Sequence, residues 1–318
     1  MNSRLSSLRA AALLAPALLS ACAQSAGVLE DEAAPEALGS ASQAIIDGEL
    51  ADEAVYAAVG ALVYYLPEVG VLDTFCSGTL VSPRAITTAR HCTPSIDLAL
   101  EFGLTPAFAI GPNAFEPVAV IPITGYVAAP AAPGHEKGLL LDGGRDVAVA
   151  YLESAPAGVT PVKLGLFDDK MLGSRFDIAG FGISDTSFFY GQKFAGTVTA
   201  RALHGRWYEL LFGDYATFRE WYFTDSSATQ PSEAEAKEWW KIYKLENKYE
   251  LLAGGLPGES VACFGDSGGP LLRGTTPQTL TTYGVSFAVE ATSSTVCGLG
   301  GSYLVFNRKM LDFVEDAL

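Results

Sequence analysis

The sequence predicts an all-β protein, and two features of its composition carry that prediction. Of its 318 residues, 49% are hydrophobic and only 18% are charged, as expected of a chain that buries a large core. Its 33 glycines and 17 prolines divide the apolar residues into short runs. Short apolar runs bounded by turn-forming residues are typical of strands joined by tight turns rather than of long helices.

The first 22 residues have the layout of an export signal. Two arginines precede an apolar stretch at 10–19, which is too short to span a bilayer because a spanning helix needs about 20 apolar residues. Two processing routes are open. The sequence Leu-Ser-Ala-Cys ending at Cys22 resembles a bacterial lipobox, in which the cysteine is acylated, whereas cleavage after Ala23 would remove the whole signal. We favour the lipobox, and on either route we expect a protein exported from the cytoplasm.

Residues 23–44 are rich in alanine, serine and acids, and they show no helix or strand period, so we interpret them as a linker or pro-segment. The folded part then starts at residue 45 and holds four cysteines: Cys76, Cys92, Cys263 and Cys297. In an oxidising compartment these predict two disulfides. Four cysteines allow three pairings, and spacing alone does not choose among them.

Five apolar runs predict strands in the folded part, and each is bounded by Gly, Pro, Asp or Ser. They lie at 55–65, 78–81, 118–123, 147–152 and 176–181.

Two segments depart from the strand pattern. Ser232 and Glu235 form a capping box, apolar residues follow at helical spacing as far as Leu252, and two glycines come next, so we predict a helix over 233–252. Its aromatic stripe either packs on the β core, which we favour, or forms an exposed face for a partner. A second helix is expected at 307–318, at the C-terminal end of the chain.

A net charge of -16 argues against nucleic acid as a partner, because binding a phosphate backbone requires a basic surface. The same charge is sufficiently explained by the solubility of an exported protein.

Ser267 lies in the sequence Gly-Asp-Ser-Gly-Gly-Pro at 265–270. A serine hydroxyl becomes an effective nucleophile only when a neighbouring base takes its proton. Glycines on both sides allow backbone N–H groups to approach a developing oxyanion closely. The motif therefore predicts a nucleophilic serine and requires a histidine.

The chain has only three histidines, His91, His135 and His204, and all of them precede Ser267. This order excludes the nucleophile elbow of the α/β-hydrolases, in which the histidine follows the serine. His91 directly follows an apolar run, while the other two lie in polar contexts. Asp146 stands at the mouth of an apolar strand, where a carboxylate needs a partner, and His91 would be such a partner.

These segments together resemble the chymotrypsin-like serine protease family, in the same order along the chain. The matching segments are Ile-Ile-Asp-Gly at 45–48, Phe-Cys-Ser-Gly-Thr-Leu-Val at 75–81, Thr-Ala-Arg-His-Cys at 88–92, Asp-Val-Ala-Val-Ala-Tyr-Leu at 146–152, Gly-Phe-Gly at 180–182 and Cys-Phe-Gly-Asp-Ser-Gly-Gly-Pro at 263–270. The departures, such as Arg90, Asp47 and Phe287 in place of commoner residues, remove no catalytic group.

The resemblance implies two six-stranded antiparallel β-barrels, roughly 45–165 and 166–306, within a protease domain at 45–318. It also implies a C-terminal helix at 307–318 and the disulfides Cys76–Cys92 and Cys263–Cys297. The stretch between Gly182 and Cys263 is longer than usual for the family, so the predicted helix belongs to an insertion, at about 186–258, near the substrate cleft.

The resemblance also implies the chemistry. Ser267 would attack the scissile carbonyl, His91 would act as base and then as acid, and Asp146 would orient the imidazole. The N–H groups of Gly265 and Ser267 would form the oxyanion hole. Cleavage before Ile45 would free an α-amino group that pairs with Asp266. We expect protein or peptide substrates, a monomer, no metal and no cofactor, and contact with a membrane only through a lipid at Cys22.

The pocket for the residue before the cut would have an apolar base. By the resemblance it is formed by Val261, Ala262, Ser286, Phe287, Ala288 and Gly301. An apolar base offers no partner for a buried Lys or Arg charge, so we expect cleavage after small or medium apolar residues. The alternatives are a catalytically silent binding module with the same fold, which would need a broken site, and a structural lipoprotein, which would leave the His, Asp and Ser residues unexplained.

Overall fold

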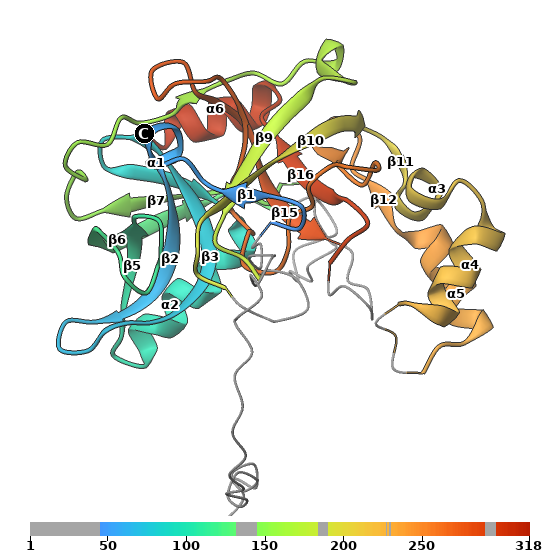
Figure 1. Cartoon of the computed structure of the whole chain (residues 1–318), viewed down its shortest axis with the longest axis horizontal. Coiled ribbons are helices and arrows are strands. Elements are labelled where there is room, and N and C mark those ends of the chain that lie inside the picture. The colour runs from blue at the N-terminus through green and yellow to red at the C-terminus, as the bar shows by residue number, and fades with distance from the viewer. Residues whose placement is uncertain (1–44, 132–144, 184–189, 227, 229, 290–296) are drawn as a thin grey trace, which may run out of the picture. The chain divides into compact units, whose positions relative to one another are not determined.

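The computed structural model describes residues 45–131, 145–183, 190–226, 228, 230–289 and 297–318, and these residues form two rings of antiparallel strands (Figure 1). All of them belong to one compact unit, residues 41–318. The all-β prediction with two barrels is confirmed.

The first ring is a closed barrel with the strand order β2-β3-β4-β7-β6-β5. Its strands are β2 (Val59–Leu66), β3 (Gly70–Ser82), β4 (Ala85–Thr88), β5 (Thr105–Ile110), β6 (Ala119–Ala128) and β7 (Ala148–Leu152). Leu62, Ile86 and Phe108 are fully buried inside it. A Cβ on Gly60 would meet the ring of Phe108, so only glycine allows this close packing.

The second ring is a six-stranded cycle, because β9 pairs with both β14 and β10. Its strands are β9 (Arg175–Gly180), β10 (Phe194–Ala202), β13 (Glu250–Ala253), β14 (Pro270–Arg273), β15 (Thr281–Val289) and β16 (Gly301–Val305). Two short strands extend it: β1 (Glu49–Leu50) pairs with β10, and β8 (Lys163–Leu164) pairs with β15.

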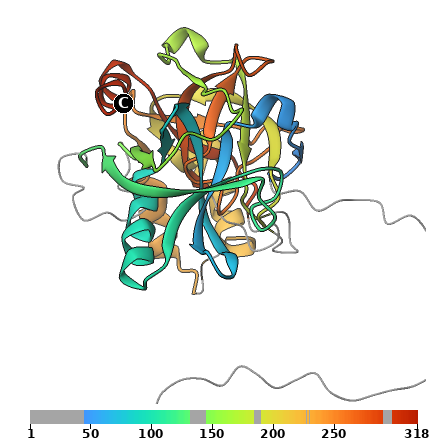
Figure 2. The ribbon, with the colours of Figure 1, turned by 90° about the vertical axis from the view of Figure 1, so that its left-hand side faces the viewer.

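The start of the expected strand at 55–65 is helical instead. Helix α1 (Glu53–Tyr56) is capped by Asp52, whose side chain accepts a hydrogen bond from the N–H of Ala54 at 2.8 Å, and β2 begins only at Val59. This hydrogen bond pairs a backbone N–H at the start of the helix, and the apolar pattern of the sequence gives no sign of it. Helix α2 (Thr93–Glu101), beside the first barrel in Figure 2, was likewise not predicted.

The C-terminal helix is present as α6 (Arg308–Asp316), with Asn307 as its N-cap. Its buried face, Met310, Leu311 and Val314, joins the same hydrophobic cluster as the first barrel. The chain thus returns from the second ring to close against the first.

The expected bounds of the insertion, 186–258, were too wide, because β10 and β13 within them are strands of the second ring. The inserted part consists of three helices, α3 (Trp207–Phe212), α4 (Tyr215–Thr224) and α5 (Glu233–Ile242), with a two-stranded ladder of β11 (Gly205–Arg206) and β12 (Lys244–Leu245). In Figure 1 the helices lie at the edge of the second ring. Their aromatic side chains pack against one another around Tyr208 and Phe218, and Leu252 of β13 joins the same cluster. The stripe thus packs in a cluster of its own, in which Trp239 and Trp240 are partly buried, while Ile242 is 54% exposed. It meets the β core through Leu252, so the favoured interpretation, packing on the β core, is confirmed only in part. No helix in the described part of the chain is long and apolar enough to cross a membrane.

The predicted helix over 233–252 was wrong at its C-terminal end, because α5 stops at Ile242. Tyr243 is extended, Leu245 enters the ladder with β11, and residues 250–253 form a strand of the second ring. Pairing with strands distant in sequence overrides the helical spacing of these apolar residues.

Candidate active site

Strand pairing places His91 and Asp146 next to each other, although 55 residues separate them in the sequence. Thr88, the last residue of β4, pairs with Ala148, the first residue of β7. The chain leaves β4 into a 3₁₀ turn, Arg90–Cys92, that holds His91, and Asp146 lies just before β7.

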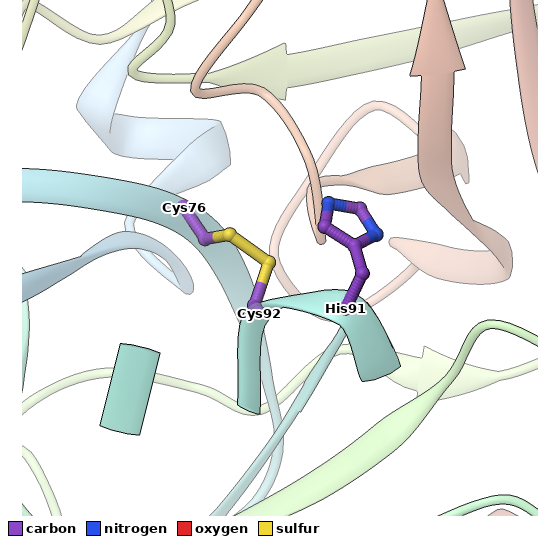
Figure 3. Close-up of side chains that lie close together, drawn as sticks. All are labelled: Cys76, His91 and Cys92. Atoms are coloured by element: carbon purple, nitrogen blue, oxygen red, sulfur yellow. A yellow bond between two sulfur atoms is a disulfide. The ribbon is translucent and has the colours of Figure 1, made fainter. Parts of the chain in front are cut away.

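A disulfide fixes the turn that holds His91. Cys92 is bonded to Cys76 of β3, and Figure 3 shows the imidazole of His91 and the disulfide beside each other on the same side of the turn. The ligand atoms of Cys76, His91 and Cys92 lie within 4.8 Å of one another. Because the two sulfurs are bonded to each other, neither is a thiolate available to a metal, and the cluster serves as a cross-link. Cys263 is bonded to Cys297, so both expected pairings are confirmed.

Asp146 accepts two hydrogen bonds from His91. Its Oδ1 accepts from the backbone N–H at 2.8 Å, and its Oδ2 lies 2.5 Å from Nδ1. The carboxylate side chain is 5% exposed and the imidazole 23% exposed. With its proton on Nδ1, a neutral imidazole carries a lone pair on Nε2 and can take a proton there.

Ser267 belongs to the loop at 263–269, just before β14, which we call the serine loop. This loop packs against the first barrel. The carbonyl oxygen of Ser267 accepts a hydrogen bond from the N–H of Ser77 at 2.8 Å and lies 3.8 Å from Sγ of Cys92. Ser267 is therefore held beside the residue that follows His91. Among the described atoms the hydroxyl of Ser267 makes no hydrogen bond to His91.

Glycine is required on both sides of this serine. Gly268 has φ +87°, and a Cβ there would collide with the Ser77 carbonyl and the Thr88 hydroxyl. Gly265 has φ +98°, and a Cβ there would lie 2.8 Å from Cα of Gly182. Within the described residues the N–H groups of Gly265 and Ser267 donate no hydrogen bond, and both residues are partly exposed. These two groups can donate to an acceptor from outside the chain.

Asp266 is 2% exposed and is held by two backbone N–H groups, from Gly182 to Oδ1 and from Cys263 to Oδ2, each at 2.8 Å. Burial raises the pKa of Asp266 to about 7, although these two hydrogen bonds oppose the shift. A Cβ on Gly182 would lie 2.7 Å from the carboxylate. The Gly-Phe-Gly sequence is therefore explained by the space that Asp266 needs.

The N-terminal segment of the folded part reaches the same region. Ile45 is fully buried in the core of the second ring, and Ile46 exchanges two backbone hydrogen bonds of 3.0 Å with Val261. Asp47 has φ +55°, a left-handed conformation that aspartate tolerates better than most residues.

The residues expected to form the specificity pocket lie on two sides of the serine loop. Ser286, Phe287 and Ala288 belong to β15, beside Gly301 on β16. Ser286 exchanges two hydrogen bonds of 2.8 Å with the loop, accepting from the N–H of Gly268 and donating to the carbonyl of Gly269. Val261 and Ala262 are buried in the segment before the serine.

Phe287 and Ala288 also line a pocket whose other wall comes from the insertion, including Trp207, Tyr208 and Tyr243. The insertion therefore borders β15.

Other expected residues lie away from this site or outside the described part. His204 is exposed in the turn before β11. His135 and Cys22 lie outside the described residues. Sequence reasoning missed Ser77, which contacts the serine loop; the only signal was its place between Cys76 and Gly78 in a segment already singled out.

Comparison with solved structures supports the fold that the two rings of strands define. No protein-family model and no curated relative matches the sequence. The solved structures do match, and the chain has the chymotrypsin-like fold. One of them is neuropsin, a serine protease expressed in the limbic system of mouse brain: the match covers 86% of this chain and 99% of neuropsin, at 18% identity and a TM-score of 0.54.

Proposed function

We propose that the protein is a serine endopeptidase that uses His91, Asp146 and Ser267. The main support for the proposal is the pair of hydrogen bonds from His91 to Asp146. The serine loop lies beside this pair, because the N–H of Ser77 in the same barrel donates to the carbonyl of Ser267. A buried carboxylate that holds both the backbone and the ring of a histidine sets its tautomer and its orientation.

In the proposed reaction the Oγ of Ser267 attacks the scissile carbonyl carbon while Nε2 of His91 takes the hydroxyl proton. The oxyanion accepts hydrogen bonds from the N–H groups of Gly265 and Ser267. The C–N bond then breaks, and His91 gives the proton to the leaving amine. Water hydrolyses the acyl-enzyme by the same steps and regenerates Ser267.

The inferred pocket favours small or medium apolar residues before the cut. Val261 and Ala262 contribute no carboxylate at its base, so a Lys or Arg side chain would lose its hydration without gaining a counter-ion. Ala288 narrows the pocket where a glycine would admit a large ring.

Residues 45–318 are proposed to be the protease domain, and residues 23–44 its pro-segment. In the uncleaved chain the nitrogen of Ile45 is an amide and carries no charge. Cleavage of the bond between residues 44 and 45 would create an ammonium group that can compensate the buried charge of Asp266. Ala44 suits the inferred pocket, so the enzyme could make this cut itself. A lipid on Cys22 would then anchor the precursor to the bacterial envelope, and activation would release the protease.

The test is digestion of a mixed peptide library with the activated protein and with its Ser267→Ala variant, followed by sequencing of the cuts. We expect cleavage by the wild type alone, after small or medium apolar residues. Cuts dominated by Arg or Lys would overturn the specificity, and intact peptides would favour the binding module.

A further inference from the structure

Ser77 lies at the contact between the two barrels, and both its side chain and its backbone bind the other barrel. It belongs to β3 and is fully buried. Its hydroxyl donates to the carbonyl oxygen of Gly265 at 2.9 Å and accepts from the N–H of Phe181 at 3.1 Å. Its own N–H donates to the carbonyl of Ser267 at 2.8 Å, and its carbonyl accepts from the hydroxyl of Thr88 at 2.9 Å.

The two partners of the hydroxyl need a group that both donates and accepts. The N–H of Phe181 can only donate and the carbonyl of Gly265 can only accept, so a hydroxyl between them satisfies both. Among the described residues neither group has another hydrogen-bond partner. An alanine at this position would remove the hydrogen-bond partner of both backbone groups, and the N–H of Phe181 is buried.

The hydroxyl of Ser77 binds a glycine of the serine loop. Gly265, at φ +98°, can rotate more freely than any residue with a side chain. Its N–H belongs to the peptide plane that begins at the carbonyl of Phe264, and that carbonyl accepts from the N–H of Ile183 at 2.7 Å. The next plane begins at the carbonyl of Gly265, which Ser77 holds. The planes on both sides of Gly265 are therefore fixed.

We propose that Ser77 is a positioning residue, whose hydroxyl fixes the Gly265 peptide so that the Gly265 N–H stays directed at the oxyanion. This inference rests on the proposed peptidase function. It gives Ser77 no contact with substrate, because its side chain is buried behind the loop. Its effect is to reduce the reorganisation that the donor needs when charge develops.

The experiment compares Ser77→Ala and Ser77→Gly with the matched control Thr79→Val. Thr79 is on the same strand and is equally buried, and its hydroxyl has no hydrogen-bond partner within the described part of the chain. The concentration of active sites is measured by labelling Ser267 with a phosphonate, so that kcat refers only to folded, competent molecules. The affinity for a peptide boronate, whose oxygen occupies the oxyanion position, is measured in parallel.

Loss of a whole oxyanion donor lowers kcat by roughly 10²–10³-fold, so we expect a misdirected donor to lower it by about 10-fold or more. KM should change little, and boronate affinity should fall by about the same factor as kcat. Thr79→Val should match the wild type. A Ser77 variant with unchanged kcat per labelled site and unchanged boronate affinity would overturn the role of Ser77, and whichever of the two Ser77 variants folds decides this. A wild type that neither cleaves peptides nor reacts with the phosphonate would instead overturn the peptidase function.

Discussion

Asp146 binds His91 at two points, the backbone N–H and the ring Nδ1, and both of its oxygens are used. The contact therefore sets the place of the histidine in the chain as well as the direction of its ring. An amide at position 146 keeps the shape of this contact, but its NH₂ group cannot accept a hydrogen bond from the Nδ1–H of His91.

We expect Asp146→Asn to lower turnover by about 10⁴-fold with the fold preserved, because it favours the imidazole tautomer with its proton on Nε2. Ser267→Ala and His91→Ala should each abolish peptidase activity. The measurement is kcat/KM on a cleaved library peptide, with circular dichroism as the control for folding. Full activity in Ser267→Ala would contradict the assignment.

We expect activation and release from the membrane to be one event. Wild-type protein and an Ala44→Pro variant are expressed, membranes are separated, and the N-terminus of the soluble protein is sequenced. The wild type should yield soluble, active protein that begins at Ile45, while the variant should remain inactive and bound to the membrane. Active enzyme still anchored through Cys22, or a soluble active form with another N-terminus, would contradict this expectation.

The raised pKa of Asp266 predicts that the free energy of unfolding of the uncleaved chain falls as the pH rises. This pKa is about 7 in the fold, against the ordinary aspartate value of 3.8, so the folded state binds the proton more tightly than the unfolded state. This contribution is complete below about pH 4, declines as the pH rises, and is lost above about pH 7. The difference of roughly three pKa units corresponds to about 4 kcal/mol.

The measurement is urea unfolding between pH 4 and pH 8 of Ala44→Pro combined with Ser267→Ala, which cannot process itself. Adding Asp266→Asn should remove most of this pH dependence, because the amide does not titrate. Equal slopes with and without Asp266→Asn would show that the carboxyl does not control it.

The buried ion pair between Lys193 and Glu53 predicts that removing the acid destabilises the protein more than removing the lysine. The side chain of Lys193 is 0% exposed, its Nζ lies 2.8 Å from Oε1 of Glu53, and it lies 5.4 Å from the centre of the Phe181 ring. Burial lowers the pKa of Lys193, against the opposing effect of Glu53. Glu53→Gln leaves a buried cation without a counter-ion, whereas Lys193→Met leaves a carboxylate that water can reach.

Glu53→Gln should therefore destabilise the protein more than Lys193→Met, by about 1–3 kcal/mol at pH 7. A lowered lysine pKa means that stability is lost as the pH falls through the folded value, so the Glu53→Gln variant should recover part of the loss near pH 10. Urea unfolding at the two pH values measures both effects. A larger loss in Lys193→Met would show that packing dominates this site.

Local sequence was sufficient for the all-β class, because short apolar runs and turn residues act over a few positions. It was also sufficient for the N-cap of α5, where the Ser232 side chain accepts from the N–H of Glu235, and for the C-terminal helix, whose apolar side is visible in its periodicity. The order of the histidines and Ser267 excluded a rival fold without any structure. The pairing of the cysteines needed the family resemblance, since spacing left three choices.

Tertiary structure decided what depends on contacts between distant segments. The apolar residues between 244 and 253 have the spacing of a helix, yet 244–245 and 250–253 form strands, because β11 and β16 supply hydrogen-bond partners that the local sequence does not reveal. Ser77 carries no motif of its own, and its link to Gly265 spans 188 residues. Such a contact forms only when the two barrels pack against each other. Packing buries backbone groups of one barrel, and these then need hydrogen-bond partners from the other barrel.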